Sequence, residues 1–154
     1  MSLNINVYAD GSCLNNGKEG ASGGWAFIIL NGSETIKVSG REEGTTNNRM
    51  ELMAVIRAIE FLSNSKADLT IYLDSQYVKD GCEQWLLKWK CNNWLTSSKR
   101  PVKNKDLWIQ LDALLGNINV SFQKVKAHSD HPINDLVDQL ARKAAQGTLL
   151  NKYN

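Results

Sequence analysis

Paired cysteines, long apolar runs and a strong excess of one charge are all missing from this chain of 154 residues. Its three cysteines are odd in number, widely spaced and free of a Cys-x-x-Cys pattern, which argues against a disulfide framework or a zinc ribbon. Apolar runs are short, and the first residues lack the basic and apolar regions of a signal peptide. We therefore expect a cytoplasmic protein with reduced thiols and no membrane association.

The formal net charge of +2 is too small to identify a binding partner. Internal repeats, low-complexity segments and interdomain linkers are also missing from the sequence. With 42% hydrophobic residues, the chain has the size and composition for one domain with a substantial core. The sequence therefore predicts a single domain over residues 1–154, and we expect a monomer.

The most informative residues are carboxylates that each lie at the edge of a predicted strand or helix. They are Asp10, Glu51, Asp74 and Asp138. Like charges within a few ångströms push one another toward protonation unless a cation neutralises them. Oxygen ligands without a cysteine or histidine cage suit Mg²⁺ or Mn²⁺, and such sites keep coordination positions for phosphate oxygens and water. This set therefore indicates phosphoryl chemistry.

The amino-terminal part has the pattern of an antiparallel meander. Alternating apolar and polar residues over Leu3–Ala9 predict a strand that ends at Asp10, and the Gly-, Asn- and Ser-rich stretch 15–24 predicts a loop. The Asn31-Gly32 pair between two apolar runs predicts a hairpin. The two hairpin strands are predicted at residues 25–30 and 35–39.

Helical spacing of apolar residues begins at Asn48 and predicts a helix that carries Glu51 in its first turn. The next strand, Leu69–Leu73, leads directly into Asp74. Two parallel strands joined by a helical crossover would place Asp10 and Asp74 together at their carboxyl ends, where open α/β sheets bind ligands. The remaining segments are predicted as helices at 75–89 and 104–115, a strand at 120–125, a polar loop at 126–134 and a last helix with Asp138 near its start.

Basic and aromatic residues alternate over residues 85–105, which we call the handle, and no Asp or Glu occurs there. Its basic residues and tryptophans are Lys88, Lys90, Lys99, Arg100, Lys103, Lys105, Trp85, Trp89 and Trp94. This mixture suits a polyanion whose sugars and bases offer apolar surface. Tryptophans at helical spacing are equally typical of a core with a solvated lysine face, so both interpretations stay open.

Six strings, in this order, carry a family resemblance: Asp10–Leu14, Thr45–Ala54, Asp74–Val78, Pro101–Asn104, Asp106–Trp108 and Val125–His128. Together they resemble bacterial ribonuclease HI, of the type 1 ribonuclease H family, and the resemblance runs from about Val7 to Ala145. It implies an α/β ribonuclease H-like fold with a mixed five-stranded sheet flanked by helices.

The resemblance also implies an endonuclease that hydrolyses the RNA strand of RNA–DNA hybrids and leaves 5′-phosphate and 3′-hydroxyl ends. The family uses two Mg²⁺ ions, which Mn²⁺ can replace, to clamp the entering and leaving oxygens. By this resemblance, Asp10 bridges both ions and Asp138 holds the one that activates water. Glu51 and Asp74 hold the one that stabilises the leaving 3′ oxygen.

His128 matches the family's flexible-loop histidine, which implies a catalytic role as a proton carrier or an aid to product release. A polar loop is where an imidazole that titrates near neutrality can work, although a surface histidine without a role is the simpler interpretation of composition alone. His131 lies three residues further on, but the absence of a second pair of ligands argues against zinc.

Further positions match the family's substrate-binding residues: Cys13, Asn16, Thr46, Asn47, Asn48, Gln76, Trp85, Lys88, Trp89, Lys90, Trp94 and Lys99. Neutral amides among them can read 2′-hydroxyls and base edges without adding fixed charge. For Asn15 and Asn16, turn formation is the alternative, and both interpretations stay open.

Two segments depart from the family pattern. The loop over residues 15–23 differs from the family's usual Pro/Gly-rich turn and is longer, which affects the placement of Asn16. In the handle, Cys91, Asn92 and Asn93 stand where strong bases are common, so we expect weaker binding of phosphates.

Two other functions fit parts of the pattern. One is a related metal-dependent nuclease or recombinase that acts on DNA, and the other is a module that binds hybrids without cutting them. The complete Asn-Arg-Met-Glu segment and the handle favour hybrid cleavage over the first. The four acids argue against the second, because an inert module has no reason to retain mutually repelling carboxylates.

Overall fold

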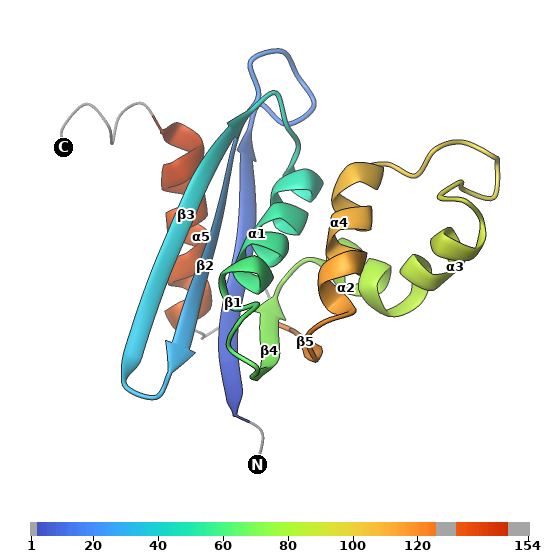
Figure 1. Ribbon diagram of the computed structural model, residues 1–154. Coiled ribbons are helices and arrows are strands. Elements are labelled where there is room, and N and C mark those ends of the chain that lie inside the picture. Colours follow the sequence, from blue (N-terminus) through green and yellow to red (C-terminus); the bar gives the residue numbers. More distant parts are fainter. Residues whose placement is uncertain (1–2, 126–131, 148–154) are drawn as a thin grey trace.

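The computed structural model describes residues 3–125 and 132–147. Its centre is a five-stranded mixed sheet with helices packed on both faces, which confirms the predicted α/β arrangement (Figure 1). In chain order, the elements are β1 (Asn4–Leu14), β2 (Ser22–Asn31), β3 (Glu34–Glu43), α1 (Asn47–Phe61), β4 (Asp68–Leu73), α2 (Gln76–Asp80), the π-helical segment η1 (Gly81–Trp85), α3 (Leu86–Cys91), α4 (Lys105–Leu115), β5 (Val120–Lys124) and α5 (Pro132–Gln146).

The strands lie in the order β3-β2-β1-β4-β5. The first three form an antiparallel meander, and β4 and β5 continue the sheet parallel to β1. The predicted hairpin is confirmed, with Asn31 paired to Glu34 and the turn at Gly32-Ser33. Gly32 has φ 63°, a left-handed conformation that glycine adopts without steric cost. The predicted loop is shorter than expected, because residues 22–24 already belong to β2.

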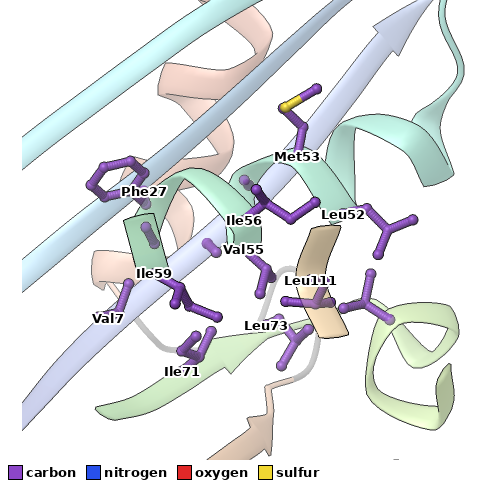
Figure 2. Packing of buried hydrophobic residues seen from close by; sticks show 14 of the residues in the cluster. Val7, Phe27, Leu52, Met53, Val55, Ile56, Ile59, Ile71, Leu73 and Leu111 are labelled. Carbon is purple, nitrogen blue, oxygen red and sulfur yellow. The ribbon is translucent and has the colours of Figure 1, made fainter. Parts of the chain in front are cut away.

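Helix α1 covers one face of the sheet and contributes eight buried residues to the main core. Thr46 caps it by accepting a hydrogen bond from the Arg49 amide at 3.2 Å. The helix contributes Leu52, Ile56 and Ile59 to the main core, which also contains side chains of the sheet and of α4 (Figure 2). Burying a side chain of this size contributes about 1.5–3 kcal/mol. The helix begins at Asn47, so Glu51 is its fifth residue and lies in the second turn instead of the predicted first.

Helix α5 covers the opposite face, across β2 and β1 (Figure 1). Val137 and Ala141 are fully buried against Ala26 and Ile28 of β2. The helix begins at Pro132, within the segment predicted as loop, which is consistent with the tolerance of proline in a first helical turn. Asp138 therefore lies in the second turn of α5.

The handle projects beside α4 (Figure 1). Segments α2, η1 and α3 together span the predicted helix 75–89, and a bridge between Leu95 and Pro101 closes the loop that follows. Trp108 of α4 is fully buried beneath it. Within the described part of the chain, no helix has the length and apolar character needed to cross a membrane.

Candidate active site

Strand register places Asp10 beside Asp74. The parallel pairing of β1 with β4 ends at Tyr8 and Tyr72, and each aspartate lies two residues beyond its tyrosine. The predicted end of β1 at Asp10 is wrong, because antiparallel pairing with β2 continues to Leu14. The predicted proximity of the two aspartates is confirmed, because their carboxylate oxygens lie within 4.8 Å of each other. The chain after β4 continues into α2.

Glu51 reaches the same place because Gly11 has no side chain. A Cβ atom at Gly11 would collide with the backbone of Met50 and Glu51, so any larger residue would push α1 away from β1. The amide of Gly11 also donates a hydrogen bond to Asp10 Oδ1 at 2.9 Å. Gly11 thus orients the carboxylate of Asp10 through its amide, and its lack of a side chain allows Glu51 to lie close by.

The carboxylates of Asp10, Glu51 and Asp74 offer oxygen atoms that all lie within 4.8 Å of one another. Asp10 is only 3% exposed, and burial raises its pKa to about 8, opposed by a hydrogen bond with Glu51 and supported by the nearby charge of Asp74. Burial, followed by the charge of Asp10, raises the pKa of Glu51 well above its ordinary value. Three ionised acids at this spacing need a positive counter-charge.

A hard divalent cation fits this donor set. All three groups are carboxylates, no cysteine or histidine completes the described cluster, and carboxylate oxygens are the ligands that Mg²⁺ prefers. The raised pKa of Asp10 is consistent with this, because a cation between the acids would remove the repulsion that favours protonation. The site is therefore able to hold a metal ion.

Asp138 approaches the cluster from α5 and lines the same cavity. Its carboxyl group contributes to the raised pKa of Asp10 through a hydrogen bond and through its charge. Its Oδ2 also forms an ion pair with Arg142 Nε at 3.0 Å, one helical turn further along α5. Sequence analysis did not single out Arg142, although the four-residue spacing on a helix could have indicated it.

An open cavity of about 610 Å³ surrounds the four acids. Among the predicted substrate-binding residues, Cys13, Asn47, Asn48 and Gln76 line it. Asn134 lines it too and was missed by sequence analysis. This residue is 3% exposed, and within the described residues its Oδ1 accepts no hydrogen bond. A buried amide oxygen of this kind has no signal in the sequence beyond its position one turn before Asp138.

Asn16 and Thr46 lie next to the cavity and have structural contacts of their own. Asn16 Oδ1 accepts a hydrogen bond from the Asn47 amide at 3.0 Å, and Thr46 caps α1. Asn15 has φ 57°, typical of a turn asparagine. The turn interpretation therefore holds for Asn15, whereas a role of Asn16 and Thr46 in substrate binding stays a prediction.

The tryptophans of the handle pack against the rest of the protein. Trp89 meets the buried Trp108 edge-on with ring centroids 5.2 Å apart, and Trp94 is half-buried against the main core. Trp85 lies between Tyr77 and Trp89, with centroid distances of 6.2 Å and 5.8 Å. The core interpretation thus applies to a part of each ring, and the exposed parts stay candidates for substrate contact.

The handle lysines differ in how much of their charge is free for a ligand. Lys88 and Lys99 are exposed, whereas Lys90 forms an ion pair with Asp112 of α4 at 3.3 Å. Surface ion pairs of this kind are weak, about 0–1 kcal/mol, so a phosphate can compete for Lys90. His128 and His131 lie outside the described residues, and their predicted roles are not tested by this geometry.

A mixed sheet of this strand order, with acids gathered at the carboxyl ends of its central parallel strands, defines an α/β protein with a ribonuclease H-like fold. The RNase H family model matches residues 3–146. A ribonuclease H of Treponema denticola is 42% identical over 94% of this chain and 98% of its own length. A ribonuclease HI of Neisseria meningitidis serogroup B is 46% identical over 94% of this chain and 97% of its own length.

Solved structures of related proteins have the same fold. A crystal structure of a type 1 RNase H with the type 2 active-site motif superposes with a TM-score of 0.84 at 30% identity, over 96% of this chain and 74% of that chain. An RNase H1 crystallised with an RNA/DNA hybrid has the same fold, with a TM-score of 0.71 at 20% identity over 94% of this chain and 99% of that chain. This chain belongs to the RNase H family and is a ribonuclease H enzyme.

Proposed function

We propose that this protein cuts the RNA strand of RNA–DNA hybrids internally with the help of two divalent cations, preferably Mg²⁺, and leaves 5′-phosphate and 3′-hydroxyl ends. The observation that carries the proposal is the convergence of Asp10, Glu51 and Asp74 within 4.8 Å in a polar cavity. Family membership supports the reaction, and the related RNase H1 that was crystallised with an RNA/DNA hybrid supports the substrate.

Asp10, Glu51, Asp74 and Asp138 would hold the cations. When bound, such a pair lowers the pKa of the attacking water and offsets the charge that develops on the leaving oxygen. The water oxygen bonds to phosphorus, the P–O3′ bond breaks, and the released 3′ oxygen takes up a proton. The attacking water must lose a proton as its bond to phosphorus forms, and we assign His128 to carry this proton away or to aid release of the product.

The cavity walls suit the sugar edge of a hybrid. Asn47, Asn48 and Gln76 offer neutral amide donors and acceptors beside the acids, and Cys13 adds an apolar contact. Further along, Asn16 and Thr46 lie at the start of α1, and the exposed faces of Trp85, Trp89 and Trp94 accompany Lys88, Lys90 and Lys99. We propose that the handle binds the backbone of the hybrid away from the cut.

We further propose that residues 1–154 form one domain that works as a monomer in the cytoplasm. The single domain is supported by the main core, which runs without interruption from the sheet through α1 to α4 and the handle. Sedimentation of the purified protein over a range of concentrations tests the oligomeric state.

The decisive experiment is incubation of the protein with a hybrid whose RNA or DNA strand is end-labelled, with Mg²⁺ and with a chelator. The expected result is cation-dependent shortening of the RNA strand alone, with products that a polymerase can extend and that a 5′-phosphate-dependent exonuclease can degrade. Single-stranded RNA and duplex DNA are the controls. Tight binding of the hybrid without cleavage would favour the binding module instead, and equal cleavage of duplex DNA would favour a DNA nuclease.

A further inference from the structure

The side chain of Gln76 is held between two groups of opposite charge. Lys124 Nζ donates a hydrogen bond to Gln76 Oε1 at 2.7 Å, and Gln76 Nε2 donates one to Asp80 Oδ1 at 2.6 Å. An ammonium group can only donate and an ionised carboxylate can only accept. The pair therefore selects one of the two orientations of the amide, with the oxygen toward β5 and the nitrogen toward the end of α2.

The two holding residues come from elements that the fold places firmly. Lys124 is the last residue of β5 and pairs in register with Leu73, the residue before Asp74. Asp80 is the last residue of α2, four positions after Gln76, and accepts a second bond from Gln84 Nε2 at 3.4 Å. The Gln76 amide is thus tied to the same strand ends that carry the acidic cluster.

This arrangement leaves Gln76 with one hydrogen-bond donor and one acceptor for a ligand in the cavity. One N–H and one lone pair of Oε1 are not used by Asp80 and Lys124, and Gln76 lines the cavity beside Asp74. Gln76 and Lys124 are both exposed. Bonds to charged partners are nevertheless stronger than bonds between neutral groups, so the amide is held more firmly than one that bonds to water alone. A side chain that is already oriented loses less conformational freedom when a ligand binds.

We infer that Lys124 and Asp80 are positioning residues that orient the Gln76 amide for the sugar edge of the nucleic acid in this cavity. The inference rests on the proposed function, because the amide needs a substrate to read. Lys124 acts in this scheme through Gln76 and makes no contact of its own with phosphate. Lys124 therefore differs from a lysine that attracts the nucleic acid by its positive charge alone.

The test is a double-mutant cycle with Lys124→Met and Gln76→Ala, assayed on a hybrid of defined sequence. Removing one hydrogen bond from a recognition residue should raise KM by roughly 3- to 10-fold in the parent protein, while kcat stays within about twofold. In the Gln76→Ala background, the same Lys124→Met change should alter KM by less than about twofold, because its target is gone. Lys124→Arg, which keeps the donor, should restore most of the affinity.

Lys37→Met is the matched control for charge. Lys37 is an exposed lysine on β3, the opposite edge strand, so its replacement removes the same charge away from the cavity and should leave KM unchanged. Melting temperatures of all variants show whether each one is folded. An equal rise in KM from Lys124→Met in both backgrounds would mean that the lysine binds phosphate directly, and this result would overturn the inference.

A second readout needs no substrate and therefore separates this inference from the proposed function. In the free protein, the side-chain amide of Gln76 should give two well-separated ¹H–¹⁵N signals with a high order parameter. Lys124→Met and Asp80→Ala should each bring these signals closer together and lower the order parameter, whereas Lys37→Met should not. A Gln76 amide that is equally mobile in the parent and in Lys124→Met would contradict the inference, whatever the enzyme cuts.

Discussion

Asp138 Oδ2 lies 3.0 Å from Arg142 Nε, so the fourth acid of the site is paired with a protein cation as well as lying beside Asp10. A divalent ion that binds Asp138 must compete with this guanidinium or share the carboxylate with it. Because Arg142 also lines the cavity, its charge lowers the local concentration of any cation. We therefore expect Arg142 to lower the affinity of the site for a divalent cation.

Replacing Arg142 by Gln should strengthen binding of the ion that we propose Asp138 holds. We expect the dissociation constant for Mg²⁺ to fall by roughly 3- to 10-fold at low ionic strength, since about 1 kcal/mol of competing interaction is removed. Calorimetric titration of the substrate-free protein measures this directly. Lys143→Gln, which removes a neighbouring charge of α5 that does not line the cavity, is the control. Equal effects of both changes would show that only net charge matters.

Asp10→Asn should abolish turnover by at least about 10³-fold and leave hybrid binding measurable, because it removes a cation ligand and not the binding surface. Gel-shift binding in Ca²⁺ and turnover in Mg²⁺, measured on the same preparation, give the two quantities. A loss of binding as large as the loss of rate would refute this division of roles.

The cation-free protein should lose stability as the pH rises from about 4 to about 8. The pKa of Asp10 in the folded protein is about 8, whereas an unfolded aspartate has a pKa of about 3.9. The folded state therefore holds a proton that the unfolded state has released, and the free energy of unfolding falls with pH across this window. Glu51 changes stability in the same direction.

Asp10→Asn removes the part of this dependence that comes from Asp10 and should stabilise the cation-free protein at pH 8 by roughly 1–3 kcal/mol. Urea unfolding at several pH values, in the presence of a chelator, measures the difference between the two proteins. Saturating Mg²⁺ should reverse the order, because the parent gains binding energy that the variant lacks. If the stability of the parent rises between pH 5 and pH 8 relative to Asp10→Asn, the folded protein does not raise the pKa of Asp10.

His128→Ala should reduce turnover by roughly 10- to 100-fold at neutral pH, less than the loss of a metal ligand, since a positioned proton carrier contributes a smaller part of the rate. The pH dependence of kcat is the informative measurement. An imidazole with a pKa near neutrality makes kcat change with pH in this range, and the variant should lack that change. Identical pH profiles of the two proteins would remove His128 from the mechanism. His131→Ala is the control within the same segment.

A lysine restored to the handle should strengthen hybrid binding at low salt, and the best position for it is Cys91. Asn92 donates a hydrogen bond to the Leu95 carbonyl at 3.0 Å and Asn93 has φ 54°, so these two residues shape the turn. Cys91 is exposed at the end of α3. Each added phosphate contact steepens the slope of log affinity against log salt by about 0.9 on B-form DNA.

For Cys91→Lys we therefore expect a steeper salt dependence of hybrid affinity and an unchanged turnover number at saturation. Affinities at several salt concentrations test this expectation. Ser33→Lys, at the tip of the β2–β3 hairpin, adds the same charge far from the handle and serves as the control. A salt slope that stays the same in Cys91→Lys would place the nucleic acid away from the handle.

Much of the architecture could be read from local patterns. The spacing of Leu52, Ile56 and Ile59 marks α1, and alternation marks β4, because each pattern depends only on which neighbours in the chain share a face. The Asp-Gly and Asn-Arg-Met-Glu strings also indicated which acids belong to the site. Three of those acids do meet within 4.8 Å.

Other features depend on which segments meet, and only the tertiary structure decides that. The extension of β1 past Asp10 follows from its pairing with β2, and the position of Asp74 follows from where pairing with β4 stops. No local pattern in the sequence shows that Lys124 bonds to Gln76, 48 residues earlier in the chain. The sequence by itself determined the chemical identity of the site. The register of the sheet and the packing of α5 decided its geometry, because contacts between distant residues form only when the whole core assembles.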